Sequence, residues 1–163
     1  MGPELSAYSF ELNKRVDTFL YGRVVWEMMS GYWPHVESMS DDEHDLAFAP
    51  IWRETPKIVF SRTLRQADRD TRVIGENLAE EVTALKRLPG KDLLLSGGSN
   101  LAATLTELGL IDEYHIVVHP VVLGGGKQLF PTSKDRIGMR LTETRTFDSR
   151  TVLLHYRSAE QGE

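Results

Sequence analysis

The sequence contains no cysteine. A chain without thiols forms no disulfide, no thiolate metal site and no cysteine nucleophile. This composition fits the reducing cytoplasm, where we expect the protein to reside. Among the histidines, His35 and His44 lie near acidic residues, but only His44 falls in the acidic run DDEHD at 41–45. We therefore predict no metal site.

Basic residues and long apolar runs are also in short supply. Lysine and arginine number 19 against 24 acidic residues, which gives a formal net charge of −5. Nucleic-acid binding needs a basic face, so this balance argues against such a partner but not against a small anionic ligand. No apolar run approaches the ~20 residues of a transmembrane helix, and the start of the chain does not resemble a signal or transit peptide. We expect no membrane partner.

Strand and helix patterns alternate through the first two thirds of the chain. Strand patterns occupy 16–22, 57–61, 71–75 and 92–96. Helical patterns occupy 4–15, 23–29, 41–48, 78–88 and 99–108, with a loop at 31–38. Ser40 and Asn77 are the expected capping residues of the third and fourth helices. This alternation predicts a mostly parallel sheet, because parallel strands need helical crossovers.

The last third of the chain has a different pattern. Residues 113–123 read as an extended apolar segment. Residues 139–147 and 150–157 alternate polar and apolar side chains around Asp148 and Ser149, which indicates an antiparallel hairpin. We therefore predict an α/β fold with a mostly parallel central sheet, helices on both faces and a C-terminal antiparallel hairpin. No linker interrupts the pattern, so residues 1–163 are predicted to form a single domain.

The stretch LLLSGGSN at 93–100 places two glycines between a strand and a helix. Glycine lets the backbone approach a ligand without a β-carbon in the way. The helix that starts at Ser99 would direct unpaired N–H groups towards that ligand, and ligands of open α/β sheets bind at such strand ends. Gly97 and Gly98 are also consistent with no more than a tight turn, because short glycine motifs are common.

Two other strand ends have the same character. Gly22 and Arg23 follow one strand, and Ser61, Arg62 and Thr63 follow another. The planar guanidinium of arginine binds phosphate oxygens in pairs. A single arginine in such a place is more commonly part of a surface salt bridge. Three such turns on neighbouring strands, however, predict a pocket for a ligand with several phosphates, such as NADPH.

Six segments can be considered together: FLYGRVVWEM, WP at 33–34, PKIVFSRTL, LLLSGGSNLAATL, GLIDEYHIVVHPVVLGGGKQLF and TVLLHYR. In combination they resemble the dihydrofolate reductase-like superfamily, and more narrowly its riboflavin-biosynthesis reductase branch, the RibD C-terminal domain family. The resemblance covers about residues 16–157. It implies an NADPH-dependent reductase of a small heterocyclic or carbonyl substrate, similar to 5-amino-6-(5-phosphoribosylamino)uracil reductase. It also implies a homodimer, with the apolar stretch at 117–123 near the dimer contact.

The resemblance further implies which residues hold the cofactor. One turn matches the family's pyrophosphate site, although the family often has threonine where Val25 stands. A second turn matches the site of the adenosine 2′-phosphate, and the glycine pair matches one that is often joined by a cis peptide. The implied cofactor-binding residues are Gly22, Arg23, Val25, Ser61, Arg62, Thr63, Gly97, Gly98, Ser99, Asn100 and Leu101. No catalytic side chain is assigned.

One family feature has no counterpart in this sequence. Members normally begin with a central strand and a loop resembling S-[LVM]-D-G, which walls the nicotinamide and the substrate. Residues 1–15 do not match that segment. Without such a strand the sheet would have an exposed central edge, which another chain or rearranged N-terminal residues could cover. The alternative hypothesis is therefore a non-catalytic dimeric nucleotide-binding module of the same fold.

Overall fold

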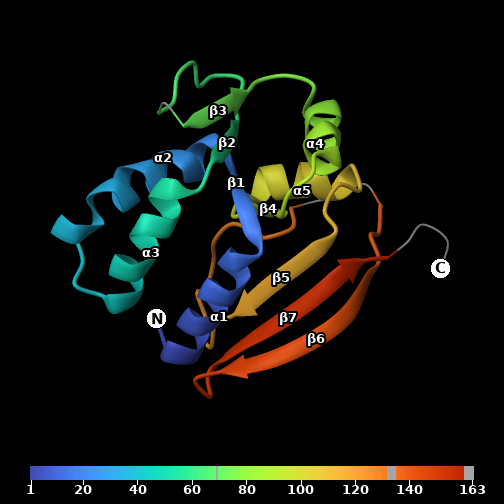
Figure 1. Cartoon of the computed structure of the whole chain (residues 1–163). Helices are drawn as coiled ribbons and strands as arrows, with labels where there is room; N and C mark the ends of the chain where they lie inside the picture. Colours follow the sequence, from blue (N-terminus) through green and yellow to red (C-terminus); the bar gives the residue numbers. More distant parts are fainter. Residues whose placement is uncertain (69, 132–134, 160–163) are drawn as a thin grey trace.

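The strands of the protein form two separate sheets, seen in a computed structural model that describes residues 1–68, 70–131 and 135–159 (Figure 1). The first sheet is parallel and has the order β3-β2-β1-β4. Its strands are β1 (Val16–Gly22), β2 (Lys57–Phe60), β3 (Thr71–Ile74) and β4 (Asp92–Leu95). The second sheet is antiparallel and has the order β5-β7-β6. Its strands are β5 (Glu113–Val118), β6 (Met139–Phe147) and β7 (Thr151–Ser158).

Helices cover both faces of the parallel sheet, and a further helix, α1, lies against the antiparallel sheet. The helices are α1 (Pro3–Lys14), α2 (Arg23–Tyr32), α3 (Glu43–Glu54), α4 (Leu78–Arg87) and α5 (Ser99–Glu107), with a 3₁₀ turn η1 (Trp33–Ser38). In Figure 1, α2 and α3 lie on one side of this sheet, and α4 and α5 lie on the other. The predicted α/β fold with a parallel central sheet, helices on both faces and a closing hairpin is confirmed. No helix in the described ranges is long and apolar enough to cross a membrane.

The central strand β1 is apolar on both of its faces. Phe19 and Tyr21 pack into one cluster with Trp26 of α2 and Trp52 of α3. Leu20, between them in the chain, points to the opposite face and packs in a second cluster. A strand covered on both sides needs apolar residues at successive positions, which is why FLY reads as a continuous apolar run. This double burial fixes the place of β1 and hence of the turn that follows it.

Residues 3–14 form the helix α1, which lies against the antiparallel sheet. Leu5 and Tyr8 are buried with Phe147 and Leu153 of that sheet. The amino end of α1 is held by Asp148 in the β6–β7 turn, whose carboxylate accepts hydrogen bonds from the N–H groups of Glu4 and Leu5, at 3.1 and 3.3 Å. The unpaired strand edge expected in the middle of the fold is present. Within the described residues β4 pairs only with β1, and β5 pairs only with β7, so each has one edge without a partner strand.

Several element boundaries differ from the predictions. Asp42, not Ser40, caps α3, because its carboxylate accepts the N–H groups of His44 and Asp45. The helix then continues through Pro50 to Glu54, beyond the predicted end. The loop predicted at 31–38 is the last turn of α2 followed by η1, in which proline occupies the first turn, where it is tolerated.

Two further predictions were wrong. Asn77 makes no side-chain capping hydrogen bond, and its φ of 55° places it in the left-handed region. The strand predicted over 113–123 ends at Val118, just before His119 and Pro120. Proline cannot donate to a strand ladder, and the segment that follows has no partner strand in the described residues.

Candidate functional site

Three turns meet at the carboxyl edge of the parallel sheet. They follow the neighbouring strands β2, β1 and β4, with Gly22 in register with Phe60 and Leu20 in register with Leu95. Since parallel strands end at the same edge, the turns after them are adjacent. The structure therefore brings together the three segments in which the sequence predicts phosphate contacts.

The first and third turns touch each other directly. The N–H of Gly22 donates a hydrogen bond to the carbonyl of Gly97, at 2.8 Å. The peptide between Gly97 and Gly98 is cis, as the resemblance implies. A β-carbon on Gly97 would lie 3.3 Å from Cγ2 of Val25, and one on Gly98 would lie 3.5 Å from the same atom. The glycine pair thus packs against the first turn of α2 with little room for a side chain.

The helices α2 and α5 begin at this edge with free N–H groups. Neither has a side-chain capping hydrogen bond, and neither has an acidic residue in its first turn. The other three α-helices of the described chain all carry acidic residues in the first turn. Unpaired N–H groups and the positive end of the helix dipole favour a bound anion, and acidic side chains would compete with it. The two helix starts at the rim are therefore the ones suited to phosphate.

The second turn is held in place by Ser61. Its N–H donates to the carbonyl of Ile74, at 3.0 Å, and its Oγ accepts the N–H groups of Thr63 and Leu64, at 3.2 and 2.9 Å. This local turn exposes Arg62, and no residue in the described ranges pairs with its guanidinium. A free, exposed guanidinium beside hydroxyl donors has the chemistry of a phosphate site.

Arg23 has a partner within its own helix. Its Nη1 donates to both carboxylate oxygens of Glu27, at 3.0 and 2.9 Å, as an exposed i, i+4 ion pair. Exposed helix pairs of this kind contribute only about 0.3–0.5 kcal/mol. A phosphate at the start of α2 would therefore compete with Glu27 for this side chain. The remaining predicted residues, Ser99, Asn100 and Leu101, form the first turn of α5 next to Gly98.

Sequence reasoning missed the buried polar contacts under α1 and α3. Lys57 is buried at the amino end of β2, its Nζ 4.1 Å from the Trp52 ring, and burial lowers its pKa to about 8. It lies at the opposite end of β2 from Ser61, so it belongs to the core and not to the candidate site.

A second unpredicted group consists of Glu113, His115 and His155, whose contacts depend on strand register and not on sequence spacing.

Comparison with known proteins decides the family. The model of the RibD C-terminal domain matches residues 1–153. The chain belongs to the RibD C-terminal domain family. The predicted resemblance is thereby confirmed. Members of this family typically bind NADPH on a reductase-like dihydrofolate reductase fold.

Individual relatives agree with the family assignment. The chain is 42% identical over 156 residues to the uncharacterised protein YyaP of Bacillus subtilis (strain 168), covering 96% of this chain and 80% of YyaP. It is 34% identical over 141 residues to the uncharacterised protein YwjB of the same strain, covering 86% of this chain and 73% of YwjB. A candidate riboflavin biosynthesis protein from Shewanella sp. PV-4 shares the fold, with a TM-score of 0.71 at 19% identity over 93% of this chain and 78% of that one.

Proposed function

We propose that this protein is an NADPH-dependent reductase of a small heterocyclic or carbonyl substrate, with chemistry similar to that of 5-amino-6-(5-phosphoribosylamino)uracil reductase. The observation that supports it most strongly is the contact between Gly22 and Gly97, which joins two uncapped helix starts at one edge of the sheet. The family assignment supports the same cofactor.

The residues at this edge suit a polyphosphate cofactor. The N–H groups at the starts of α2 and α5 would hold the pyrophosphate, with Arg23 moving from Glu27 to the phosphate. Arg62, flanked by Ser61 and Thr63, would hold the adenosine 2′-phosphate, which NADH lacks. The contribution of Val25 is packing under the glycine pair, since its side chain has no hydroxyl to donate.

The chemical step divides between cofactor and protein. When bound, NADPH would supply a hydride to the carbon of a carbonyl or imine group, and water is the simplest source of the proton that this group would need. The chain orients the cofactor through backbone amides and guanidinium groups, so these residues set binding and geometry and carry no covalent step.

The proposal is tested by comparing NADPH with NADH. At about 100 times its dissociation constant, NADPH should stabilise the protein by about 2.7 kcal/mol, read as a rise in melting temperature. Replacing Arg62 by glutamine should weaken NADPH binding and leave NADH binding unchanged, because only the 2′-phosphate contact is lost. Arg65→Gln, in the same exposed loop, is the matched control. Equal stabilisation by the two cofactors, or equal effects of the two substitutions, would contradict the assignment of Arg62.

The unpaired edges of β4 and β5 favour a second candidate, a non-catalytic dimeric nucleotide-binding module. In the family the expected central strand walls the nicotinamide, and no described strand occupies that place here. The two candidates are separated by steady-state NADPH oxidation with pyrimidine, pterin and quinone substrates. Turnover above background that is abolished by Gly98→Leu identifies a reductase, whereas tight NADPH binding without turnover identifies the module.

We also propose that the protein is a homodimer. The end of β5 and the segment after it expose several large apolar side chains, and a second copy would remove them from water. These residues are Val118, Val121, Val122 and Leu123.

A further inference from the structure

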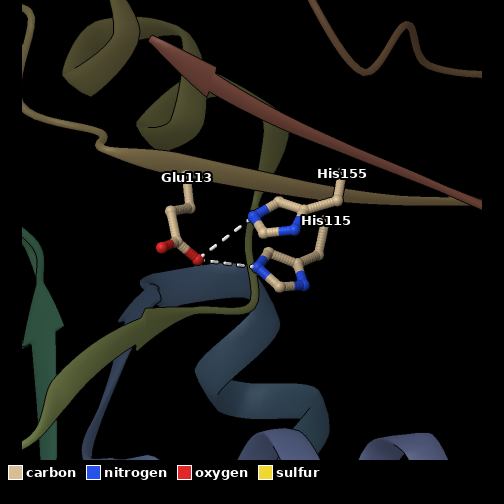
Figure 2. A group of neighbouring side chains, drawn as sticks. All are labelled: Glu113, His115 and His155. Carbon is tan, nitrogen blue, oxygen red and sulfur yellow. Dashed lines mark hydrogen bonds and ion pairs between the residues drawn. The ribbon is translucent and has the colours of Figure 1, made fainter. Parts of the chain in front are cut away.

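A group of two imidazoles and one carboxylate lies on the face of the antiparallel sheet that α1 covers. His115 of β5 and His155 of β7 are directly opposite each other in the antiparallel register. Glu113 precedes His115 by two residues, and the period-2 alternation of a strand therefore places it on the same face. Figure 2 shows the three side chains converging, with the glutamate oxygen facing both rings.

The atoms of this group have the spacing of metal ligands. Oε2 of Glu113 lies 3.1 Å from Nε2 of His115 and 3.2 Å from Nε2 of His155. The ligand atoms of the three residues all lie within 4.8 Å of one another. Atoms that share a tetrahedral zinc ion stand about 3.3 Å apart, because each is about 2.0–2.1 Å from the metal. The two separations between Glu113 and the histidines are thus close to those around one zinc ion.

Other side chains lie next to the outward-facing atoms of the group. Nδ1 of His115 is hydrogen-bonded to the hydroxyl of Tyr8 on α1. Oε1 of Glu113 accepts a hydrogen bond from Arg157, at 2.9 Å, and Nδ1 of His155 lies 3.9 Å from the carboxylate of Glu143. Metal-bound histidines typically use their second ring nitrogen as His115 does, in a hydrogen bond that orients the ring and leaves Nε2 for the metal.

One atom of the group lacks a hydrogen-bonding partner. Nε2 of His155 is buried and forms no hydrogen bond within the described residues, although Oε2 of Glu113 is only 3.2 Å away. Buried polar atoms nearly always have a hydrogen-bonding partner, and an ion absent from the structure is one explanation for a buried atom without one. A cation between Glu113 and the two rings would satisfy it.

Cationic side chains surround Glu113: its Oε1 accepts a hydrogen bond from Arg157, and a second guanidinium approaches Oε2. Arg15 is the direct competitor for the site, since its guanidinium lies 3.5 Å from Oε2. It also pairs with Asp92 at 3.1 Å, so it can retain that partner when a metal takes the glutamate oxygen.

We propose that Glu113, His115 and His155 bind one zinc ion through Oε2, Nε2 and Nε2, with water as the fourth ligand. Two imidazoles and one carboxylate form a donor set that suits Zn²⁺, and the chain has no thiolate that would compete. The ion joins β5 to β7 directly and, through Tyr8, to α1. None of its ligands belongs to the glycine and arginine turns of the cofactor proposal, so a negative result for one proposal does not contradict the other.

The test uses tag-free protein dialysed against a chelator and then against Zn²⁺ alone, with bound metal measured by mass spectrometry. We expect one zinc ion per chain and a rise in melting temperature. Co²⁺ in place of Zn²⁺ should give the visible absorption of a four-coordinate nitrogen and oxygen site. His155→Gln and Glu113→Gln should abolish uptake, and Tyr8→Phe should weaken it by about 10-fold through the loss of an outer hydrogen bond.

His119→Gln provides the matched control, because this exposed histidine follows β5 immediately and has no part in the group. It should bind zinc as the wild type does. The proposal is overturned if the wild type takes up no zinc, if His155→Gln and Glu113→Gln bind it undiminished, or if His119→Gln loses it. Circular dichroism of the metal-free variants checks folding. If His155→Gln does not fold, the milder Tyr8→Phe decides, and unchanged affinity in that variant counts against the site.

Discussion

Gly97 occupies a backbone position that other residues rarely adopt. Its φ is +130°, and a β-carbon there would meet Val25 at 3.3 Å. We expect Gly97→Ala to destabilise the fold by about 1–3 kcal/mol, the usual range for a residue forced into such a region. The same change should weaken NADPH binding, because the shifted turn carries the start of α5. Urea unfolding and a cofactor titration measure the two effects.

Gly31 inside α2 provides the control for this substitution. No atom lies within 4 Å of a β-carbon built there, and its φ is outside the left-handed region. Gly31→Ala should therefore stabilise the protein by about 0.5–1 kcal/mol, as alanine does in a helix interior. Effects of the same sign at the two positions would contradict the account of Gly97.

Lys57 makes stability depend on pH. Burial lowers its pKa to about 8 in the folded protein from 10.5. Between these values the unfolded chain binds the proton that the folded chain has released, so stability should rise with pH, by at most about 1.4 kcal/mol per pH unit. Urea unfolding from about pH 8 to about pH 10 measures the slope. It should disappear in Lys57→Met and persist in Lys127→Met, at an exposed position. Equal slopes in all three proteins would rule out Lys57 as the source.

At the scale of elements, the amino end of α1 depends on a distant turn. Asp148 accepts two of its backbone N–H groups, from Glu4 and Leu5. Asp148→Ala should cost about 1–2 kcal/mol, since the cap is lost and alanine tolerates the φ of 52° poorly. Asp148→Asn should cost less, because asparagine keeps an acceptor and visits the left-handed region. Thermal unfolding of both variants tests this order, and a reversed order would contradict the capping role.

Element prediction succeeded for most strands and helices, failed at the caps expected at Ser40 and Asn77, and failed where a strand needed a partner. The strand at 16–22 and the glycine turns follow from apolar runs and breakers within a few residues. The segment after Val118 is as apolar as the strands of the parallel sheet, yet the side chain of Val122 is 96% exposed. Composition alone does not reveal whether a partner strand is present, and Pro120 removes the donor that pairing would need.

At the scale of the whole molecule, the exposed apolar segment at 121–123 should govern assembly. We expect the wild type to sediment with twice the chain mass of 18.5 kDa. Val122→Lys should yield monomers, because a charge in an apolar contact loses its hydration without a partner. Leu88→Lys, at a side chain 65% exposed at the end of α4, should leave the dimer intact. A wild-type monomer at micromolar concentration would refute the dimer.

Sequence alone determined the alternation of strands and helices and the three glycine- and arginine-bearing turns, since periodicity and backbone freedom are properties of neighbouring residues. Because parallel strands end at the same edge of a sheet, the prediction of a parallel sheet also placed these three turns side by side. The tertiary structure alone decided the register of β5 against β7, which brings His155 to Glu113 and His115 across some forty residues of chain. That pairing joins segments that are far apart in the chain, and no local pattern encodes it.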